Sequence, residues 1–255
     1  EEVIIQATRT KAKDPTTSQI ITTAHAINAG RMPSFPDPTP KDSDCFFVAR
    51  ETPEAILHTI TQLASQRMPQ AFQLDPVQDI QILTPMNRGL LGTQNLNVVL
   101  QSALNPPSEF KFEVERYGMT LRVGDKVIQI RNNYEKEVFN GDIGYISEIE
   151  TDPVKVHVRF DELRRVPYET GDLDELRLAY AITIHKSQGS EFPAVILPLS
   201  TQHYVMLQRN LIYTGLTRGR KRVVLVGQSS ALEISVKQTG SQHRWSGLLA
   251  RLTGP

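Results

Sequence analysis

The segment from Leu178 to Phe192 places a dense group of polar side chains between two apolar stretches. Residues 179–184 are rich in β-branched and aromatic residues, which is typical of a buried strand, and residues 194–197 predict a second strand. The intervening loop carries hydroxyl, imidazole, ammonium, amide and carboxylate groups. Such a loop could contact a phosphate backbone and a nucleotide together, because loops at strand ends of α/β sheets carry ligand sites. The alternative is a solvated connection without a ligand.

A second segment, residues 209–222, is strongly cationic and contains no acidic residue. Its apolar positions predict one buried helix face, and the following residues 223–227 predict another buried strand. Arg218 is expected where this helix ends, near the ligand-binding edge of the sheet. A planar guanidinium at that point suits bidentate contact with phosphate oxygens.

Four segments together resemble a known family. Residues 183–191 and 213–218 resemble motifs V and VI of superfamily 1 helicases, in the form of the RecD-like branch (exodeoxyribonuclease V alpha subunit-like). Residues 82–93 are similar to the segment that opens the second RecA-like domain of that branch, and residues 18–30 to the helix after motif IV. The resemblance covers residues 18–227. It implies the motor of an ATP-dependent DNA helicase.

The resemblance assigns nucleotide contacts to five positions. Arg218 matches the arginine that reaches the γ-phosphate across the interface between two RecA-like domains. Gln188 and Gly189 lie where the phosphates pass, Glu191 matches the acid that binds the ribose, and Arg9 is the candidate for the motif IV arginine. The alternatives are a structural arginine at 218 and a solvent-facing acid at 191.

The resemblance also implies DNA contacts in two loops. Thr183 and His185 match backbone contacts, with Lys186 as an addition, and the segment after residue 83 contributes Thr84, Asn87 and Arg88. For His185 the alternative is a hydrogen-bonded core histidine. For the segment after residue 83 it is a turn that starts a helix and carries a solvated arginine.

No phosphate-binding loop of the form GxxxxGK[ST] occurs in the sequence. The resemblance implies ATP with Mg²⁺ as the cofactor. Because the phosphate-binding loop is absent, the Mg²⁺ ligands would lie on a first RecA-like domain outside this chain. Together with a first residue that is Glu rather than Met, this predicts the C-terminal portion of a longer protein, inactive in ATP hydrolysis by itself. The expected partners are that first domain, single-stranded DNA, a duplex junction and recombination or repair subunits.

Two other functions stay open at this point. The resemblance implies 5′-to-3′ translocation and duplex unwinding, but the helicase part of a conjugative relaxase shares these motifs. A nucleic-acid-binding or scaffolding domain that has lost catalysis is the non-enzymatic alternative. The sequence upstream of this chain would separate the three.

Composition sets further limits. The 28 basic and 28 acidic residues of the 255-residue chain cancel, so any nucleic-acid contact must be local. A hydrophobic content of 39% without a membrane-length apolar run predicts a soluble cytoplasmic protein. The single cysteine, Cys45, excludes an internal disulfide, and no histidine or cysteine spacing predicts a metal site.

The predicted fold is α/β: a RecA-like, mostly parallel sheet flanked by helices and interrupted by a small antiparallel, Src-homology-3-like β-barrel. Residues 1–109 are expected to begin the second RecA-like domain, residues 110–170 to form the barrel, and residues 171–255 to complete the domain. Strands are predicted at 45–50, 79–83 and within 112–160, and helices at 19–27, 53–67 and 89–103. We expect the strand at 79–83 to pair with strands after residue 178, leaving strand 125–130 outside that sheet.

Overall fold

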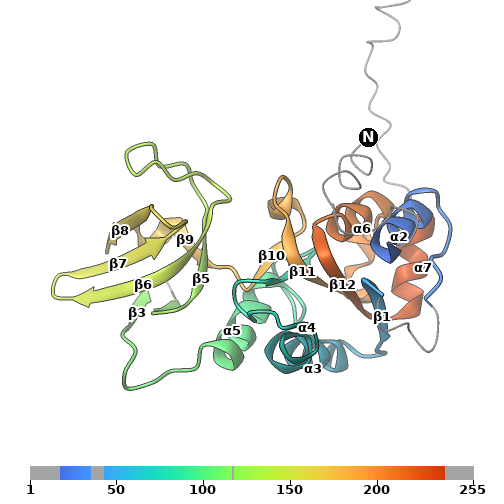
Figure 1. The fold of residues 1–255 in the computed structure, drawn as a ribbon, viewed down its shortest axis with the longest axis horizontal. Helices are drawn as coiled ribbons and strands as arrows, with labels where there is room; N and C mark the ends of the chain where they lie inside the picture. The colour runs from blue at the N-terminus through green and yellow to red at the C-terminus, as the bar shows by residue number, and fades with distance from the viewer. Residues whose placement is uncertain (1–17, 36–42, 117, 239–255) are drawn as a thin grey trace, which may run out of the picture.

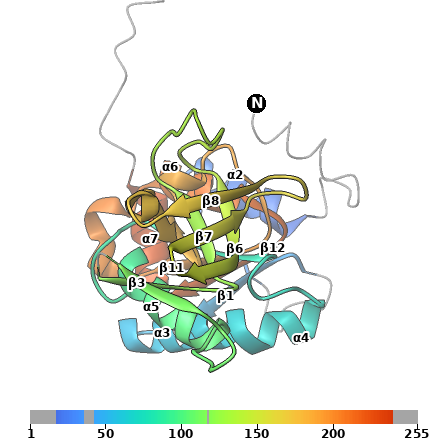
Figure 2. The same ribbon diagram turned by 90° about the vertical axis from the view of Figure 1, so that its left-hand side faces the viewer.

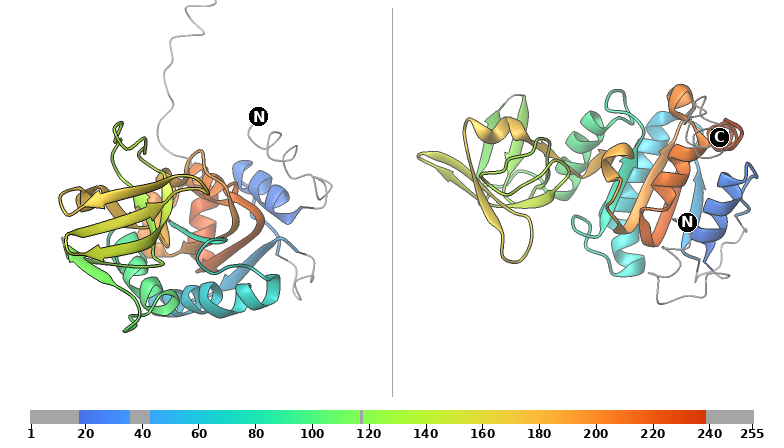
Figure 3. Two further views of the ribbon diagram at one scale, coloured as in Figure 1. Left: turned by 60° about the vertical axis from the view of Figure 1, so that its left-hand side comes forward. Right: turned by 90° about the horizontal axis from the view of Figure 1, so that it is seen from above.

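The computed structural model describes residues 18–35, 43–116 and 118–238, which form two parts (Figure 1). The first, here called the α/β body, is a parallel sheet with helices on both faces. The second, here called the antiparallel module, comprises residues 113–178 and stands to one side of the body (Figure 3, right). The chain leaves the body after its helix α5 (Thr93–Leu104) and returns through the last strand of the module.

The sheet of the α/β body has five strands in the order β1-β12-β11-β2-β10, and every neighbouring pair is parallel. Long apolar runs form these strands because a parallel sheet is buried on both faces; all five residues of β2, for example, are buried. As predicted, the strand near residues 79–83 pairs with two strands that follow residue 178. The bounds are β1 Cys45–Ala49, β2 Ile80–Thr84, β10 Ala181–Thr183, β11 Phe192–Leu199 and β12 Gly219–Gly227.

Two groups of helices cover the two faces of this sheet (Figure 1). Alternate residues of β12 serve the two faces, with Val224 and Val226 in one core and Val223 and Leu225 in the other. The first face is covered by α3 (Pro53–Gln62), a π-helical turn (Leu63–Arg67), α4 (Met68–Phe72) and α5. The second face is covered by α2 (Gln19–Asn28), α6 (Arg209–Leu216) and α7 (Ser229–Lys237).

Helix starts follow local capping chemistry. The Thr52 hydroxyl accepts a hydrogen bond from the Ala55 amide at 3.2 Å and so caps the start of α3. The predicted start of the next helix at residue 89 is wrong, because α5 begins at Thr93. Gly89 has a φ of +91°, and residues 85–92 form a turn that carries the chain from β2 into the helix.

The antiparallel module contains a five-stranded sheet in the order β8-β7-β6-β5-β9 and a separate two-stranded sheet, β3-β4 (Figure 2). The sequence predicted β3 to β7 but not β8 or β9, and it did not predict that β3 and β4 pair only with each other. Pro167 is compatible with β8 because that strand lies at the sheet edge. The bounds are β3 Glu113–Arg116, β4 Met119–Arg122, β5 Lys126–Gln129, β6 Ile143–Thr151, β7 Val154–Arg159, β8 Arg165–Glu169 and β9 Leu176–Leu178.

The two parts share a core although they share no strand pairing among the described residues. Strand β5 pairs with β6 and β9, so the prediction that residues 125–130 stay outside the parallel sheet is confirmed. Strand β9 extends the antiparallel sheet to Leu178, beyond the predicted range 110–170. The apolar interior of the module is continuous with the core under α3 and α5, and Leu178 and Tyr180 belong to that shared core.

Candidate functional site

Two loops lie side by side where β2 and β10 end. Thr84 and Thr183 are paired in the parallel register, and the Ile184 amide donates to the Thr84 carbonyl at 3.0 Å. The Thr84 side chain is fully buried, and its hydroxyl donates to the Leu91 carbonyl at 2.7 Å. Thr84 therefore closes the turn at residues 85–92 and holds it beside the loop that follows β10.

The first loop presents Asn87 and Arg88 to solvent. The Asn87 carbonyl accepts from the Gln94 amide at 3.1 Å, and its side-chain oxygen accepts from the Thr93 hydroxyl at 3.0 Å. Gly92 is required here, because a Cβ at this position would lie 2.4 Å from the Arg88 carbonyl oxygen. The turn thus fixes the backbone of Arg88 while its guanidinium remains exposed.

The second loop presents His185 and Lys186, both exposed, in a short 3-10 turn, His185–Ser187. The half-buried Thr183 hydroxyl accepts from the Lys186 amide at 3.3 Å and so shapes this turn. Partial burial and the positive charge of Arg177 lower the pKa of Lys186. Arg177 belongs to β9 of the antiparallel module, so cationic groups from both parts of the molecule meet at this loop.

Arg218 lies at the opposite edge of the sheet. It precedes β12, and its carbonyl accepts from the amide of Phe192, the first residue of β11, at 2.8 Å. The strands of the sheet begin at this edge, the amino edge. The loops that follow β2 and β10 lie at the other edge, the carboxyl edge, where the strands end. The expectation that Arg218 lies near the usual ligand-binding, carboxyl edge of the sheet is therefore wrong, because the connection from α6 to β12 delivers it to the amino edge.

The Arg218 side chain is half-buried against the ends of both motif segments. It donates to the Thr214 carbonyl at 3.2 Å, to the Ser190 carbonyl at 3.3 Å and to the Thr217 hydroxyl at 3.2 Å. A guanidinium has five N–H donors, and these contacts use one on each nitrogen. Among the described residues, these contacts leave one N–H group on each terminal nitrogen of Arg218. A bidentate contact with a phosphate needs two such N–H groups.

The chain from residue 188 to 191 connects the two edges. Gln188 and Gly189 are exposed, and Gly189 has a φ of +86°, a conformation that favours glycine. Glu191 is half-buried and lies 3.8 Å from the Arg220 guanidinium. The loop thus begins at His185 beside the carboxyl edge and ends at Glu191 beside Arg218, so one short segment reaches both groups of candidate residues.

Arg9 lies outside the described residues. Within the part of the chain that the structure describes, no cluster of three or more His, Cys, Asp or Glu side chains could hold a metal ion. Cys45 is buried, and burial raises the pKa of its thiol to about 12, which removes it as a nucleophile at neutral pH. No helix in the described ranges combines the length and apolar character needed to cross a membrane.

Sequence reasoning missed side chains that position the loop after β10. Asn97 of α5 donates to the Leu178 and Ala181 carbonyls at 3.0 and 2.9 Å and accepts from the Ala181 amide at 2.8 Å. Gln81 of β2 donates to the Ala179 and Tyr180 carbonyls at 2.9 and 3.1 Å. The carbonyls of residues 179–180 thus accept hydrogen bonds from the Gln81 side chain, and β10 begins only at Ala181, two residues after the predicted start of the strand. The signal available in the sequence was the position of Gln81 and Asn97, two polar residues within otherwise apolar patterns.

Comparison with known proteins shows similarity to DNA helicases. Residues 96–160 match the SH3 domain of ATP-dependent RecD-like DNA helicases, and residues 178–226 match the C-terminal domain of UvrD-like helicases. The ATP-dependent RecD2 DNA helicase of Deinococcus radiodurans is 38% identical over 173 residues, which cover 68% of this chain and 23% of that protein. The RecBCD enzyme subunit RecD of Haemophilus influenzae is 29% identical over 169 residues, 66% of this chain and 24% of that subunit. This chain thus spans about a quarter of the length of these relatives.

A solved structure supports the fold. The crystal structure of Pif1 helicase from Bacteroides, in complex with ADP-AlF3 and single-stranded DNA, aligns with 93% of this chain and 53% of its own at a TM-score of 0.51 and 17% identity. The fold is accordingly that of a RecA-like domain, as found in superfamily 1 helicases, with an inserted Src-homology-3-like module. Within that class the chain is RecD-like and resembles the C-terminal portion of those helicases.

Proposed function

We propose that this chain is the C-terminal motor portion of an ATP-dependent DNA helicase that moves 5′-to-3′ on single-stranded DNA and unwinds duplex. The observation that carries the proposal is the division of the candidate residues between the two edges of one sheet. The carboxyl edge presents exposed Asn87, Arg88, His185 and Lys186, and the amino edge presents Arg218 and Glu191. A loop that touches both edges can couple DNA contact to nucleotide chemistry.

At the carboxyl edge the chemistry suits a phosphate backbone. Arg88, His185 and Lys186 offer exposed donors on backbone turns fixed by Gly92 and Thr183. Asn87 adds a side-chain amide, while buried Thr84 and half-buried Thr183 act by holding the turns. The balanced net charge limits this surface to a few phosphate contacts, which predicts a shallow dependence of affinity on salt.

The nucleotide would be bound at the amino edge, between this chain and a first RecA-like domain. In this proposal ATP arrives with Mg²⁺ held by that first domain, because this sequence has no phosphate-binding loop. Arg218 would place its uncommitted donors on the γ-phosphate, Gln188 and Gly189 would border the phosphates, and Glu191 would bind the ribose. Arg9 remains a proposed second arginine for the same phosphate.

Partners follow from the same arrangement. The first RecA-like domain must cover the amino edge to complete the ATP site, and a duplex junction would lie at the leading end of the bound strand. Several of the relatives are named as the RecD subunit of the RecBCD enzyme, and we propose recombination or repair subunits as partners here.

The test is Arg218→Ala in a protein that joins this chain to a first RecA-like domain. An arginine that interacts with charge developing in the transition state should lower DNA-stimulated ATP turnover by about 10³ to 10⁵-fold. Nucleotide affinity should change little, and Arg218→Lys should not restore turnover because an ammonium lacks the planar fork. Binding of a fluorescent ATP analogue measures the affinity separately.

The matched control is Lys221→Ala, which removes an exposed cation three positions away on β12. Arg220 is unsuitable as a control, since it lies 3.8 Å from Glu191. Equal losses from Arg218→Ala and Lys221→Ala would mean that general charge matters, and the specific role of Arg218 would be withdrawn. A loss of folding in Arg218→Ala would show by circular dichroism, and Arg218→Lys then carries the test.

A further inference from the structure

Two adjacent residues of the antiparallel module reach the two ends of the segment that carries the candidate contacts. Asp125 directly precedes β5 and Lys126 is its first residue, and both side chains are buried. Residues next to each other along an extended chain point to opposite sides. Asp125 meets Tyr180, just before β10, and Lys126 meets Phe192, at the start of β11. Together they bracket residues 181–191.

Asp125 is fully buried at the junction with α5. Its carboxylate accepts from the Tyr180 hydroxyl at 2.8 Å, from Asn105 at 2.7 Å, from Gln101 at 2.6 Å and from the Arg122 amide at 2.7 Å. Burial raises the pKa of Asp125, and these hydrogen bonds oppose that rise. A carboxylate so completely satisfied fixes Tyr180, and therefore the beginning of β10, relative to the module.

Lys126 is buried on the other side, against the parallel sheet, with 1% of its surface exposed. Its ammonium donates to the Ile80 carbonyl at 3.4 Å and lies 5.8 Å from the centre of the Phe192 ring. The charged groups near it are Asp75 and Asp79, on the turn before β2. Tyr145 lies opposite on β6 and completes this face of the module.

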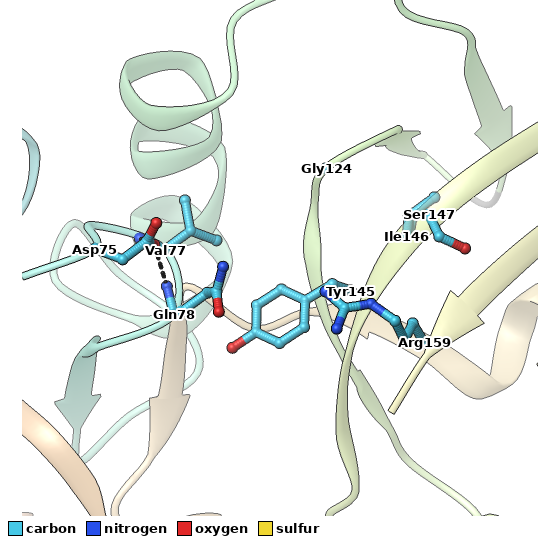
Figure 4. Close-up of a pocket in the computed structure, with 8 residues that line it drawn as sticks. All are labelled: Asp75, Val77, Gln78, Gly124, Tyr145, Ile146, Ser147 and Arg159. Carbon is cyan, nitrogen blue, oxygen red and sulfur yellow. Dashed lines mark hydrogen bonds between the residues drawn. The ribbon is translucent and has the colours of Figure 1, made fainter. Parts of the chain in front are cut away.

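A pocket of about 270 Å³ opens beside this contact, between the turn at residues 75–79 and the module (Figure 4). Tyr145 reaches across it from β6 toward Gln78, with Arg159 beside Tyr145. The pocket lies at the junction of the module and the α/β body. Lys126, paired with Tyr145, makes a buried polar contact across the same junction.

The contact with Phe192 leads directly to the candidate catalytic arginine. The Phe192 amide donates to the Arg218 carbonyl at 2.8 Å, and the Arg218 guanidinium donates back to Ser190 at 3.3 Å. At the other end, the Tyr180 carbonyl accepts from the Ile82 amide at 3.2 Å, next to the loop with His185 and Lys186. Each end of the segment therefore belongs to one of the two candidate sites.

We propose that Asp125 and Lys126 are positioning residues that couple the antiparallel module to residues 181–191, so that a displacement of the module shifts both the DNA-facing loop and Arg218. The mechanical part of this proposal needs only the fold, whereas its effect on turnover rests on the proposed function. Asp125 would set the DNA-facing end and Lys126 the Arg218 end.

Hydrogen exchange of the 255-residue chain tests the mechanical part. Lys126→Met keeps the length and apolar stem of the side chain and removes the ammonium. We expect the amides of Phe192 and Ser190 to exchange about tenfold faster or more, because a hydrogen bond to a charged group is lost together with a ring contact. Asp125→Asn should have the same effect on Ala181 and Ile184. Lys155→Met, on β7 of the same module, is the control and should leave these four amides unchanged.

Turnover provides the second readout in the protein joined to a first RecA-like domain. Lys126→Met should lower the DNA-stimulated kcat while leaving ATP turnover without DNA and the KM for ATP nearly unchanged, a split that simple destabilisation would not produce. Phe192→Leu removes the ring but not the charge and should act in the same direction, which preserves the test if Lys126→Met folds poorly.

The outcomes separate the two proposals. Unchanged exchange at residues 181–191 in Lys126→Met, Asp125→Asn and Phe192→Leu would overturn the coupling, whatever the ATPase results. Faster exchange with unaltered DNA stimulation would overturn the proposed effect on turnover, because the segment would then move without consequence for catalysis. If the unsubstituted joined protein showed no DNA-stimulated turnover, the proposed function would fail while the exchange result still decided whether the module positions the segment.

Discussion

Replacing Lys126 by methionine should change how the stability of this chain depends on pH. Burial lowers the pKa of Lys126 from 10.5 to about 7, although Asp75 and Asp79 act in the opposite direction. Between these two values the unfolded chain binds a proton that the folded chain does not. Stability therefore rises with pH across this window, and the slope from this one group approaches about 1.4 kcal/mol per pH unit.

The magnitude can be worked out for an accessible range. At pH 7 the Lys126 amine of the folded chain is half-protonated. The free energy of unfolding therefore rises by about 2 kcal/mol between pH 7 and pH 9. Below pH 7 both states carry the proton and the full cost of burying the charge is present. Lys126→Met has no charge to bury, so its stability advantage over the unsubstituted chain should be largest below pH 7. Between pH 7 and pH 9 this advantage should fall by about 2 kcal/mol.

Urea unfolding of the two proteins at pH 6, 7, 8 and 9 measures this difference. Comparing the difference in unfolding free energy between the two proteins across pH cancels the groups that titrate alike in both. Tyr145, opposite Lys126, does not titrate between pH 6 and pH 9, because burial together with Asp75 and Asp79 raises its pKa to about 12. Lys155→Met controls for the change of side chain elsewhere in the module. A stability difference between Lys126→Met and the unsubstituted chain that stays constant from pH 6 to pH 9 would refute a buried, deprotonating Lys126.

Two further predictions concern the loops and the sheet. Lys186→Ala should weaken binding to single-stranded DNA and reduce the slope of log affinity against log salt by about 0.7, measured by fluorescence anisotropy, because one phosphate contact is lost; an unchanged slope would remove Lys186 from the DNA surface. Gly227→Ala should cost more than about 2 kcal/mol in urea unfolding, since Gly227 has a φ of +156° and a Cβ there would lie 1.8 Å from the Leu199 carbonyl oxygen. Gly171→Ala, where a Cβ meets no atom within 4 Å, is its control and should stay within about 0.5 kcal/mol.

The fold was predictable where burial pattern and local chemistry agree. β11 and residues 223–227 of β12 are buried, mostly apolar runs of the kind that a two-sided sheet requires. Strand β9 could not be predicted, because it has only three residues and forms only by pairing with the edge of β5. A short strand of this kind is determined by tertiary pairing rather than by its own sequence.

The candidate site was predicted in composition but not in layout. The motif segments identified the side chains, whereas the division between two sheet edges depends on which strand each loop precedes or follows. Lys126 and Asp125 also escaped prediction, because alternating polarity in a strand indicates that charged residues face solvent. Both are buried, because the start of β5 packs against the α/β body and meets polar partners there, Gln101 of α5 for Asp125 and the Ile80 carbonyl of β2 for Lys126.

Steady-state ATP hydrolysis, with and without single-stranded DNA, tests the central claim most directly when the chain alone is compared with the chain joined to a first RecA-like domain. We expect no turnover from the chain alone, because nothing in its sequence forms a phosphate-binding loop, and DNA-stimulated turnover from the joined protein. Typical motor turnover from the isolated chain that survives repurification would contradict the account. So would a joined protein that binds ATP and DNA but hydrolyses ATP equally well when Arg218 is replaced by alanine.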